Sequence, residues 1–214
     1  MNAHTGTALL NAAADRIKEY LLMAGFLVTK AILWFEGIRI EEINPRIPRD
    51  QGSATEFYKL RDAVFAEKYG WEEPRGLERD RFDHASIFLI VIRRGRTIAG
   101  CRIIHREFLD KGQCLPVEAY LDEESTAIIT ENAVEISRMI NTLPKERTVF
   151  LGLHLAVYAY LRQRRFPIAL ATIRENYLEK VLHKKFGVEH FQKRSGIAMK
   201  KGKNVFVPIQ LHFR

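Results

Sequence analysis

The sequence predicts a mixed α/β domain built around one central sheet. Segments with strand-like patterns and segments with helical spacing follow one another as strand, helix, hairpin, strand, helix, strand, helix and closing strands. No strand is followed by a G-x-G-x-x-G or P-loop motif, which argues against a nucleotide-binding Rossmann fold. At 214 residues, with 47% hydrophobic and 28% charged residues, the chain suits one sizeable folded domain.

The N-terminal part is expected to be a helical extension, residues 1–36, in front of the main domain, residues 37–214. The segment "ALLNAAADRIKEYLLMAGFL" has a helix-forming composition. The most apolar stretch, "YLLMAGFLVTKAILWFEGI", is interrupted by Lys30 and Glu36, so it does not predict a membrane span. We favour a helix packed on the domain, and the alternative is a helix in weak contact with a membrane surface or a partner.

The main domain begins with a strand, a loop, a helix and a hairpin. "GIRIEEI" alternates like a strand, and "NPRIPRDQGSA" is a breaker-rich loop. A helix is predicted over residues 55–69, because Phe57, Leu60, Val64 and Phe65 form an apolar stripe at helical spacing. "SIFLIVIRRGRTIAGCRII" predicts a hairpin, two apolar strands joined by "RRGR".

The second half predicts two further helices and more strands. "LPVEAYLDEESTAI" is expected to hold a loop and a short helix, and "AVEISRMIN" a buried strand. "TVFLGLHLAVYAYLRQ" repeats apolar residues at helical spacing, "FPIALATI" is another buried strand, and "RENYLEKVLHKKFG" is a helix that ends near Gly187. Strand-like runs in "VEHFQKRSGIAMKKGKNVFVPIQLHF" close the chain.

Two ionisable residues, Glu135 and Arg138, lie inside the apolar strand "AVEISRMIN". Burying an isolated charge costs roughly several kcal/mol. Each of these two residues therefore needs a partner or a function. Residues three apart in a regular strand point to opposite faces, so these two cannot form a same-face pair unless a β-bulge intervenes. A buried counter-charge for each is the purely structural alternative.

Other charged residues are also placed toward the interior. Arg61 occupies the apolar stripe of the predicted helix, Asp80 and Asp83 precede a buried strand, and Arg102 lies in the second strand of the hairpin. With Glu135 and Arg138 they predict a charged, water-poor cavity between helix and sheet, lined by Phe65 and Trp71. Taken singly, the two aspartates fit a surface loop, and the two aromatic residues fit ordinary core.

Common catalytic groups are missing from the sequence. No serine lies in a G-x-S-x-G elbow, and neither Cys101 nor Cys114 lies beside an evident base. The seven histidines lack metal-binding spacing, so no metal site is expected, and the two cysteines suggest no disulfide framework and a cytoplasmic setting. Carboxylates and guanidinium groups without a nucleophile suit direct transfer between two bound substrates, with a base that takes a proton from an amine.

The arrangement resembles the signature of acyl-homoserine-lactone (autoinducer) synthases and the related long-chain N-acyl amino acid synthases. The resemblance spans roughly residues 57–141 and rests on eight residue types in order: Arg61, Phe65, Trp71, Asp80, Asp83, Arg102, Glu135 and Arg138. It implies the fold of the GCN5-related N-acetyltransferases (GNATs), with a central mixed, mostly antiparallel sheet flanked by helices. It also implies an enzyme that joins a fatty acyl group to an amine.

The resemblance implies a role for each of these residues. Glu135 would be the general base, acting through water. The guanidinium groups of Arg102 and Arg138, with Arg61, would order the site and hold the carboxylate of the acceptor. The two aspartates, Asp80 and Asp83, would hold those arginines or the acceptor's ammonium group, and Phe65 and Trp71 would line the acceptor pocket. Backbone N–H groups at a bulge in the "VEISRMI" strand would stabilise the thioester oxygen, and the acyl chain would lie between this strand and "PIALATI".

The substrates follow from where the sequence departs from these relatives. After Arg102, "LPVE" and "VEISR" look more like the N-acyl amino acid synthases and exosortase-associated relatives than like the autoinducer branch. The acceptor is therefore expected to be an amino acid, with S-adenosylmethionine as the alternative. "NTLPKERTVFLG" lacks the glycine-rich coenzyme A loop, so acyl carrier protein is the expected donor, without a tightly bound cofactor.

The distribution of charge along the chain predicts a docking site for the acyl carrier protein. Residues 162–203 contain twelve Lys or Arg against three acids, a net charge of +9, whereas the whole chain carries +8. Such a segment suits an acidic carrier protein. A nucleic-acid-binding module is the less favoured alternative, because no recognised binding motif accompanies the charge.

Overall fold

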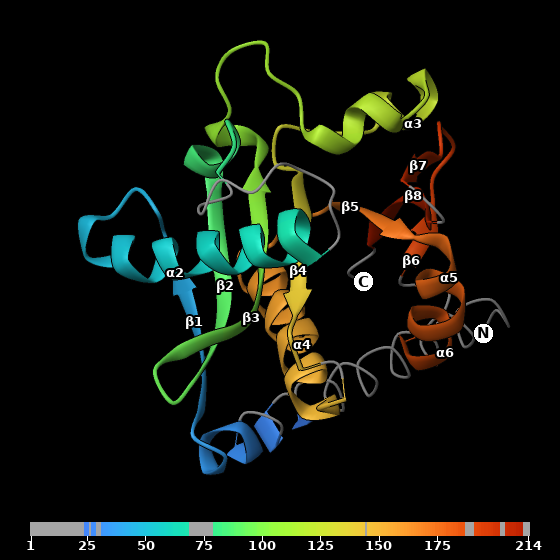
Figure 1. Cartoon of the computed structure of the whole chain (residues 1–214). Coiled ribbons are helices and arrows are strands. Elements are labelled where there is room, and N and C mark those ends of the chain that lie inside the picture. Colours follow the sequence, from blue (N-terminus) through green and yellow to red (C-terminus); the bar gives the residue numbers. More distant parts are fainter. Residues whose placement is uncertain are drawn as a thin grey trace, which may run out of the picture.

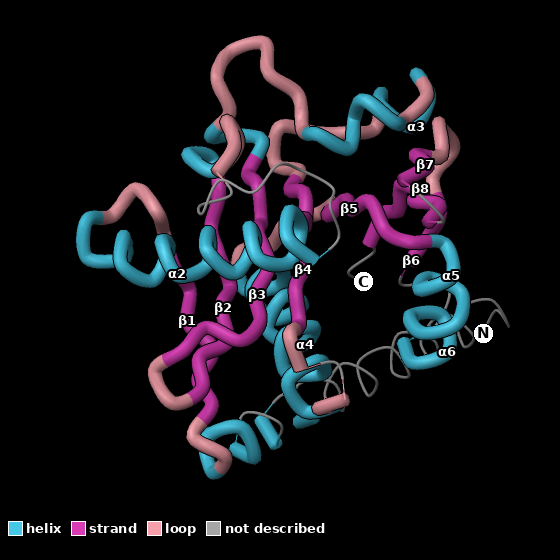
Figure 2. Tube along the Cα trace, in the orientation of Figure 1, coloured by secondary structure: helices cyan, strands magenta, loops and turns pink. Residues whose placement is uncertain are grey.

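The computed structural model describes residues 24–25, 27–28, 31–68, 79–143, 145–186, 191–201 and 204–211. Eight strands form one sheet in the order β1-β2-β3-β4-β5-β8-β6, with β7 also paired to β8 (Figures 1 and 2). The strands are β1 (Ile38–Ile43), β2 (Ser86–Arg93), β3 (Arg96–His105), β4 (Val134–Asn141), β5 (Ala169–Arg174), β6 (Phe191–Lys193), β7 (Met199–Lys201) and β8 (Asn204–Leu211). The α/β class with one central sheet is confirmed.

Most neighbouring strands are antiparallel, as the resemblance to the GNAT fold implied. The exception is the pair β4 and β5, which run parallel. This pairing covers only Val134–Ile136 against Ala169–Ala171, although β4 continues to Asn141 and β5 to Arg174. The two strands therefore separate beyond these residues, and Figure 1 shows β5 turning away from β4.

Helix α2 (Gln51–Asp62) lies across one face of β2, β3 and β4, and a π-helical turn, η2 (Ala63–Lys68), extends it (Figure 1). It begins before the predicted range 55–69, inside the segment expected to be a loop. The reason is the 3₁₀ turn η1 (Pro48–Asp50), where Pro48 occupies a first-turn position that needs no backbone N–H partner. Tyr69, the predicted last residue, lies outside the described residues.

The buried face of α2 differs in part from the predicted apolar stripe. Phe57 is fully buried, but Leu60 and Val64 are only partly buried, and Ala54, Tyr58, Arg61 and Asp62 complete the buried face. The helix packs closely on the sheet at Gly100 of β3. A Cβ atom at Gly100 would lie 2.7 Å from Phe57 Cε2 and 2.9 Å from the Leu89 carbonyl oxygen, so glycine permits this contact.

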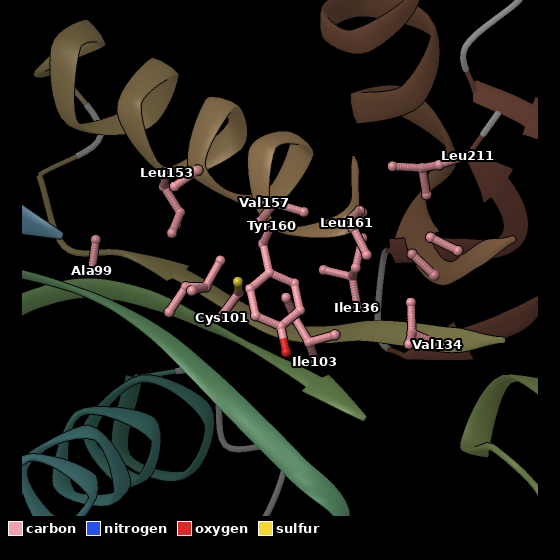
Figure 3. Close-up of a cluster of buried hydrophobic side chains, with 14 of the residues drawn as sticks. Ala99, Cys101, Ile103, Val134, Ile136, Leu153, Val157, Tyr160, Leu161 and Leu211 are labelled. Carbon is pink, nitrogen blue, oxygen red and sulfur yellow. The ribbon is translucent and has the colours of Figure 1, made fainter. Parts of the chain in front are cut away.

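Helix α4 (Arg147–Gln163) covers the opposite face of the sheet (Figure 1). In Figure 3 its residues Leu153, Val157, Tyr160 and Leu161 face β3 and β4, where Cys101, Ile103 and Ile136 belong to the same buried cluster. The helical spacing predicted for this segment is confirmed. Leu33, in a helical stretch over 31–35, is also buried there, and a Cβ atom at Gly152 would lie 2.7 Å from its Cδ1.

The remaining elements are short. They are the 3₁₀ turns η3 (Asp83–Ala85), η4 (Arg106–Phe108) and η5 (Pro116–Tyr120), helix α3 (Glu123–Ala127), and a helical run formed by α5 (Glu175–Tyr177), the π-helical turn η6 (Leu178–Leu182) and α6 (His183–Phe186). The predicted helix end at Gly187 lies outside the described residues. No helix among the described residues is long and apolar enough to cross a membrane. The division at residue 36 stays a prediction.

Candidate active site

Two arginines and two aspartates form a charged network between α2 and the sheet. Arg61, fully buried on α2, donates from Nη1 to Asp83 Oδ1 at 2.7 Å. Arg102 of β3 reaches both acids from its Nη1, at 2.6 Å to Asp80 Oδ1 and 2.9 Å to Asp83 Oδ1. The Asp80 backbone N–H also donates to Asp83 Oδ2 at 2.8 Å. Asp80 and Asp83 thus lie next to each other and provide the counter-charges of the two buried arginines.

The pKa values of this network reflect its pairing. Burial alone would raise the pKa of Asp80, but the charge and hydrogen bond of Arg102, with the Phe82 amide and Arg61, outweigh it and lower that pKa. Burial likewise acts to lower the pKa of Arg102, and the two aspartates raise it. Asp80 and Arg102 therefore stay charged at neutral pH.

A β-bulge brings Arg138 to the same side of the sheet as Glu135. Strand pairing places Arg102 opposite Ser137 and Gly100 opposite Ile140. The single residue between them on β3, Cys101, therefore lies opposite two residues of β4, Arg138 and Met139. Arg138 has a φ of 51°, a left-handed conformation that is costly outside glycine. Its guanidinium group lies 3.7 Å from Asp80 Oδ2 and 5.1 Å from the ring centroid of Phe65.

Glu135 is the buried carboxylate of the site. It lies on β4, 3% exposed, beside Ile104 of β3, and its Oε2 accepts a hydrogen bond from the Val117 amide at 2.7 Å. Burial raises its pKa to about 7, while the Val117 amide, Arg102 and Arg138 act in the opposite direction. A carboxyl group with this pKa exchanges a proton readily near neutral pH, as a general base must.

The sequence reasoning missed two contributors. Ser137 accepts a hydrogen bond from Nε of Arg102 at 3.0 Å and so holds that guanidinium from the strand next to it. The turn η5 supplies the amide that contacts Glu135 and carries a second buried carboxylate, Glu118. Ser137 stands between the two charges already noticed in "VEISR", but no sequence signal places the Val117 amide against Glu135.

Of the eight predicted residues, seven lie in the described part of the chain and come together on the α2 side of β3 and β4. Trp71 lies outside the described residues. Cys101 faces the α4 core and burial raises its pKa to about 12, as expected for a small core residue. Among the described residues no cluster of three or more metal-ligating side chains occurs.

Comparison with known families finds one family model that matches part of this chain. The family model described as "Acetyltransferase (GNAT) domain" matches residues 60–147, the stretch that contains α2's end, the charged network and β4. Residues 60–147 of the chain are therefore similar to the GNAT acetyltransferase domain. None of the curated proteins compared with the chain matches it.

Solved structures place the fold more closely, near the acyl-homoserine lactone synthases. The coenzyme A-dependent synthase BjaI, solved with S-adenosylmethionine and isopentyl-CoA, has a TM-score of 0.69 at 17% identity, over 83% of this chain and 84% of that one. LasI, another such synthase, gives 0.59 at 18% identity, over 82% and 88%. An acyl-CoA N-acyltransferase from Pseudomonas aeruginosa gives 0.50 at 13% identity, over 81% and 99%. The expected GNAT-like fold is confirmed, and the chain is structurally similar to these synthases.

Proposed function

We propose that this protein is an N-acyltransferase that moves an acyl group from a thioester to the α-amine of an amino acid or an amino acid derivative. The observation that carries the proposal is Glu135, a buried carboxylate with a pKa raised to about 7, beside Arg102 and Arg138. A base poised near neutral pH next to fixed cations suits an acceptor that brings both an ammonium and a carboxylate group.

The reaction needs two proton losses from the acceptor. Glu135 takes the first from the ammonium group, through water, and frees the amine lone pair. The amine then attacks the thioester carbonyl, the C–N bond forms and the C–S bond breaks, and the thiolate takes the second proton as the thiol leaves. Backbone N–H groups at the bulge over Arg138 and Met139 are our candidates for stabilising the oxyanion.

Among the three arginines of the site, Arg138 is best suited to hold the acceptor's carboxylate. Its side chain is 25% exposed, whereas those of Arg61 and Arg102 are almost completely buried against the aspartates. Asp80, 27% exposed, is the acid best suited to attract the ammonium group. Phe65 packs against Arg138 and would line the same pocket, with Trp71 as a predicted further wall.

Two acceptors fit this description, because S-adenosylmethionine is itself an α-amino acid derivative. Structural similarity to BjaI, solved with S-adenosylmethionine, favours autoinducer synthesis. The free amino acid is favoured by a different observation. The "LPVE" segment, where the sequence departs from the autoinducer branch, contacts Glu135 directly through Val117. The difference between branches therefore concerns the site itself.

The donor is a thioester of acyl carrier protein or of coenzyme A. The missing glycine-rich loop and the basic segment 162–203 favour the carrier protein. Coenzyme A is favoured by the similarity to BjaI and to MesI, both described as CoA-dependent. We retain the carrier protein as the first donor to test.

One incubation separates these substrates. The protein is mixed with long-chain acyl-carrier protein or the matching acyl-CoA, together with all amino acids and S-adenosylmethionine, and products are read by mass spectrometry. An N-acyl amino acid supports the amino acid acceptor, and an acyl-homoserine lactone with methylthioadenosine supports the alternative. Absence of any N-acyl product from either donor would overturn the proposal.

Glu135→Gln tests the base. The change keeps the size of the side chain and removes the proton acceptor, so we expect kcat to fall by about 10²–10⁴-fold. Glu124→Gln, at an exposed position of α3, is the matched control and should keep wild-type activity. Near-full activity of Glu135→Gln, in a protein that acylates amines, would remove Glu135 from the mechanism.

A further inference from the structure

The turn η5 (Pro116–Tyr120) contacts one of the two carboxylate oxygens of Glu135. The Val117 amide donates to Oε2 at 2.7 Å. The other oxygen, Oε1, accepts no hydrogen bond from any residue that the structure describes. The position of one backbone N–H therefore fixes the orientation of the carboxylate, and whatever holds η5 in place also holds the base.

Glu118 is the side chain that ties η5 to its surroundings. Its carboxylate is buried, 8% exposed, and Oε1 accepts a hydrogen bond from the Leu115 amide at the start of the turn, at 2.9 Å. Its Oε2 lies 3.4 Å from Nη2 of Arg106, whose Nη1 donates to the Ile129 carbonyl oxygen at 3.0 Å. Glu118 and Arg106 thus connect η5 to the turn that leads into β4.

Apolar packing does not replace this connection. The side chains of Leu115 and Val117 are buried in a cluster with Ile104 and Ala133, and they hold η5 against the sheet. Packing of this kind is not directional, however, whereas a hydrogen bond weakens steeply when its angle changes. A buried carboxylate is also costly unless it is paired and hydrogen-bonded, so its presence in a short turn needs a reason.

We infer that Glu118 and Arg106 are positioning residues for Glu135: by fixing η5, they aim the Val117 amide at Oε2 and leave Oε1 to take the acceptor's proton. Nothing in the resemblance to acyl-homoserine-lactone synthases assigned them a role. The kinetic consequence rests on the proposed function, whereas the effect on the carboxylate itself does not.

Charged neighbours also influence the pKa of Glu135, and the experiment must separate their influence from that of the Val117 hydrogen bond. Arg102 on β3 and Arg138 on β4 favour its ionised form, and Asp80 before η3 disfavours it. Removing Glu118 alone would leave the charge of Arg106 uncompensated and would lower the pKa of Glu135. The double variant Arg106→Ala/Glu118→Ala removes both charges together, so a rise in that pKa reports the lost amide contact.

The experiment measures the carboxylate directly. The full-length protein is labelled with glutamate ¹³C at the carboxyl carbon, and the Glu135 signal is identified by its absence in Glu135→Gln. In the double variant we expect the Glu135 titration to move to a pH about one unit higher, because the lost hydrogen bond favoured the charged form. We expect kcat for acyl transfer to fall about tenfold, with KM for the thioester nearly unchanged.

Two further variants keep the test sharp. Glu118→Asp retains the charge but shortens the side chain, so it should raise the pKa of Glu135 by less than the double variant does. It provides the test if the double variant does not fold. Glu118→Gln retains an acceptor for the Leu115 amide and should leave the pKa of Glu135 at or below its wild-type value. Glu124→Ala is the exposed control.

The outcomes separate the inference from the proposed function. Folded double and Glu118→Asp variants with a wild-type Glu135 titration would overturn the inference, even if the protein acylates amines. The expected titration shift in a protein that acylates no amine would support the inference and count against the proposed function.

Discussion

At the scale of single residues, the site combines four ion-paired side chains with one buried carboxylate whose pKa is raised. Asp80, Asp83, Arg61 and Arg102 each lie within 2.6–3.7 Å of an opposite charge. Glu135 has a hydrogen bond but no ion pair within the described residues, and desolvation dominates its pKa. The difference in pairing, not in residue type, separates structural acids from the candidate base.

The pH dependence of activity should reveal this base. Since Glu135 must be ionised to accept a proton and its pKa is about 7, we expect kcat/KM to rise with pH through about 7 and then level off. Initial rates at amine concentrations well below KM, measured between pH 5.5 and 8.5, give kcat/KM. A profile that is flat over this range would contradict the assignment of Glu135.

The same residue should destabilise the fold at high pH. Its folded pKa, about 7, lies above its ordinary value of 4.5, so its favourable contribution to folding is complete below about pH 4.5 and is lost as pH rises through 7. At pH 8 the ionised, buried group costs about 3 kcal/mol relative to low pH. Glu135→Gln should therefore be more stable than wild type at pH 8, with a smaller gain at pH 5.5. Urea unfolding at both values measures this, and an equal effect at the two pH values would contradict it.

Asp83 should be the residue of the network on which folding depends most. Its Oδ1 contacts two buried arginines, and Asp83→Asn would leave them with less compensating charge. Removing one partner of a buried ion pair costs about 3–5 kcal/mol, and we expect a loss of that size in the free energy of unfolding. Asp110→Asn is the control, because Asp110 is 72% exposed, and it should stay within about 0.5 kcal/mol of wild type. A comparable, small effect of both changes would contradict the structural role of Asp83.

At the scale of elements, the site depends on how α2 approaches the sheet and on where β4 is bulged. Arg61 reaches the network because α2 packs against β3 at Gly100. Arg138 reaches Asp80 because the bulge turns it to the α2 face. A regular β4 would direct Arg138 toward α4 and away from the network.

Gly100→Ala should disturb this packing. The new methyl group would approach Phe57 and the Leu89 backbone to within 3 Å, so α2 must shift, at a cost of about 1–3 kcal/mol in stability. Because α2 carries Arg61, acyl transfer should weaken as well. Gly52→Ala is the control in the same helix: nothing lies within 4 Å of its Cβ position, and it should stabilise by about 0.5–1 kcal/mol. Equal stability of the two variants in urea unfolding would contradict the packing argument.

At the scale of the whole molecule, the basic segment 162–203 is where we expect an acyl carrier protein to dock. Part of the basic segment 162–203 has internal partners, since Arg164 pairs with Glu42 and Lys193 with Glu175. Lys180 and Lys184, in the helical run after β5, have exposed side chains. They follow the strand that separates from β4, where we expect the acyl chain to lie, so they are the part of the segment best placed to meet a carrier of that chain.

Reversing these two charges tests the carrier-protein donor. We expect Lys180→Glu/Lys184→Glu to raise KM for acyl-carrier protein by about tenfold and to leave KM for acyl-CoA nearly unchanged. The wild-type KM for the carrier protein should also rise with salt, because surface charges are screened. Lys111→Glu, exposed on a loop beyond β3, is the control and should have little effect. A clear preference for acyl-CoA, insensitive to salt, would contradict the docking prediction.

Much of the fold could be predicted from local patterns. The hairpin β2–β3, the strands β4 and β5 and the helix α4 follow from apolar periodicity, which is a property of neighbouring residues. The start of α2 was missed because a proline turn leads into the helix, and proline marks both breaks and first turns. Leu60 and Val64 were assigned to the buried face, yet the helix is rotated so that Tyr58 and Asp62 occupy it instead.

The sequence by itself determined which charges the interior must accommodate: Arg61, Arg102 and Glu135 each stand in a strongly apolar segment, and burial without a partner is costly. Only the tertiary structure decided how they are paired. The bulge that turns Arg138 depends on the register between β3 and β4, and the Val117 amide reaches Glu135 from 18 residues away along the chain. Register and loop contacts arise from pairing between distant segments, which local periodicity does not encode. Whether a buried carboxylate becomes a paired structural acid or a base near neutral pH is set by those contacts.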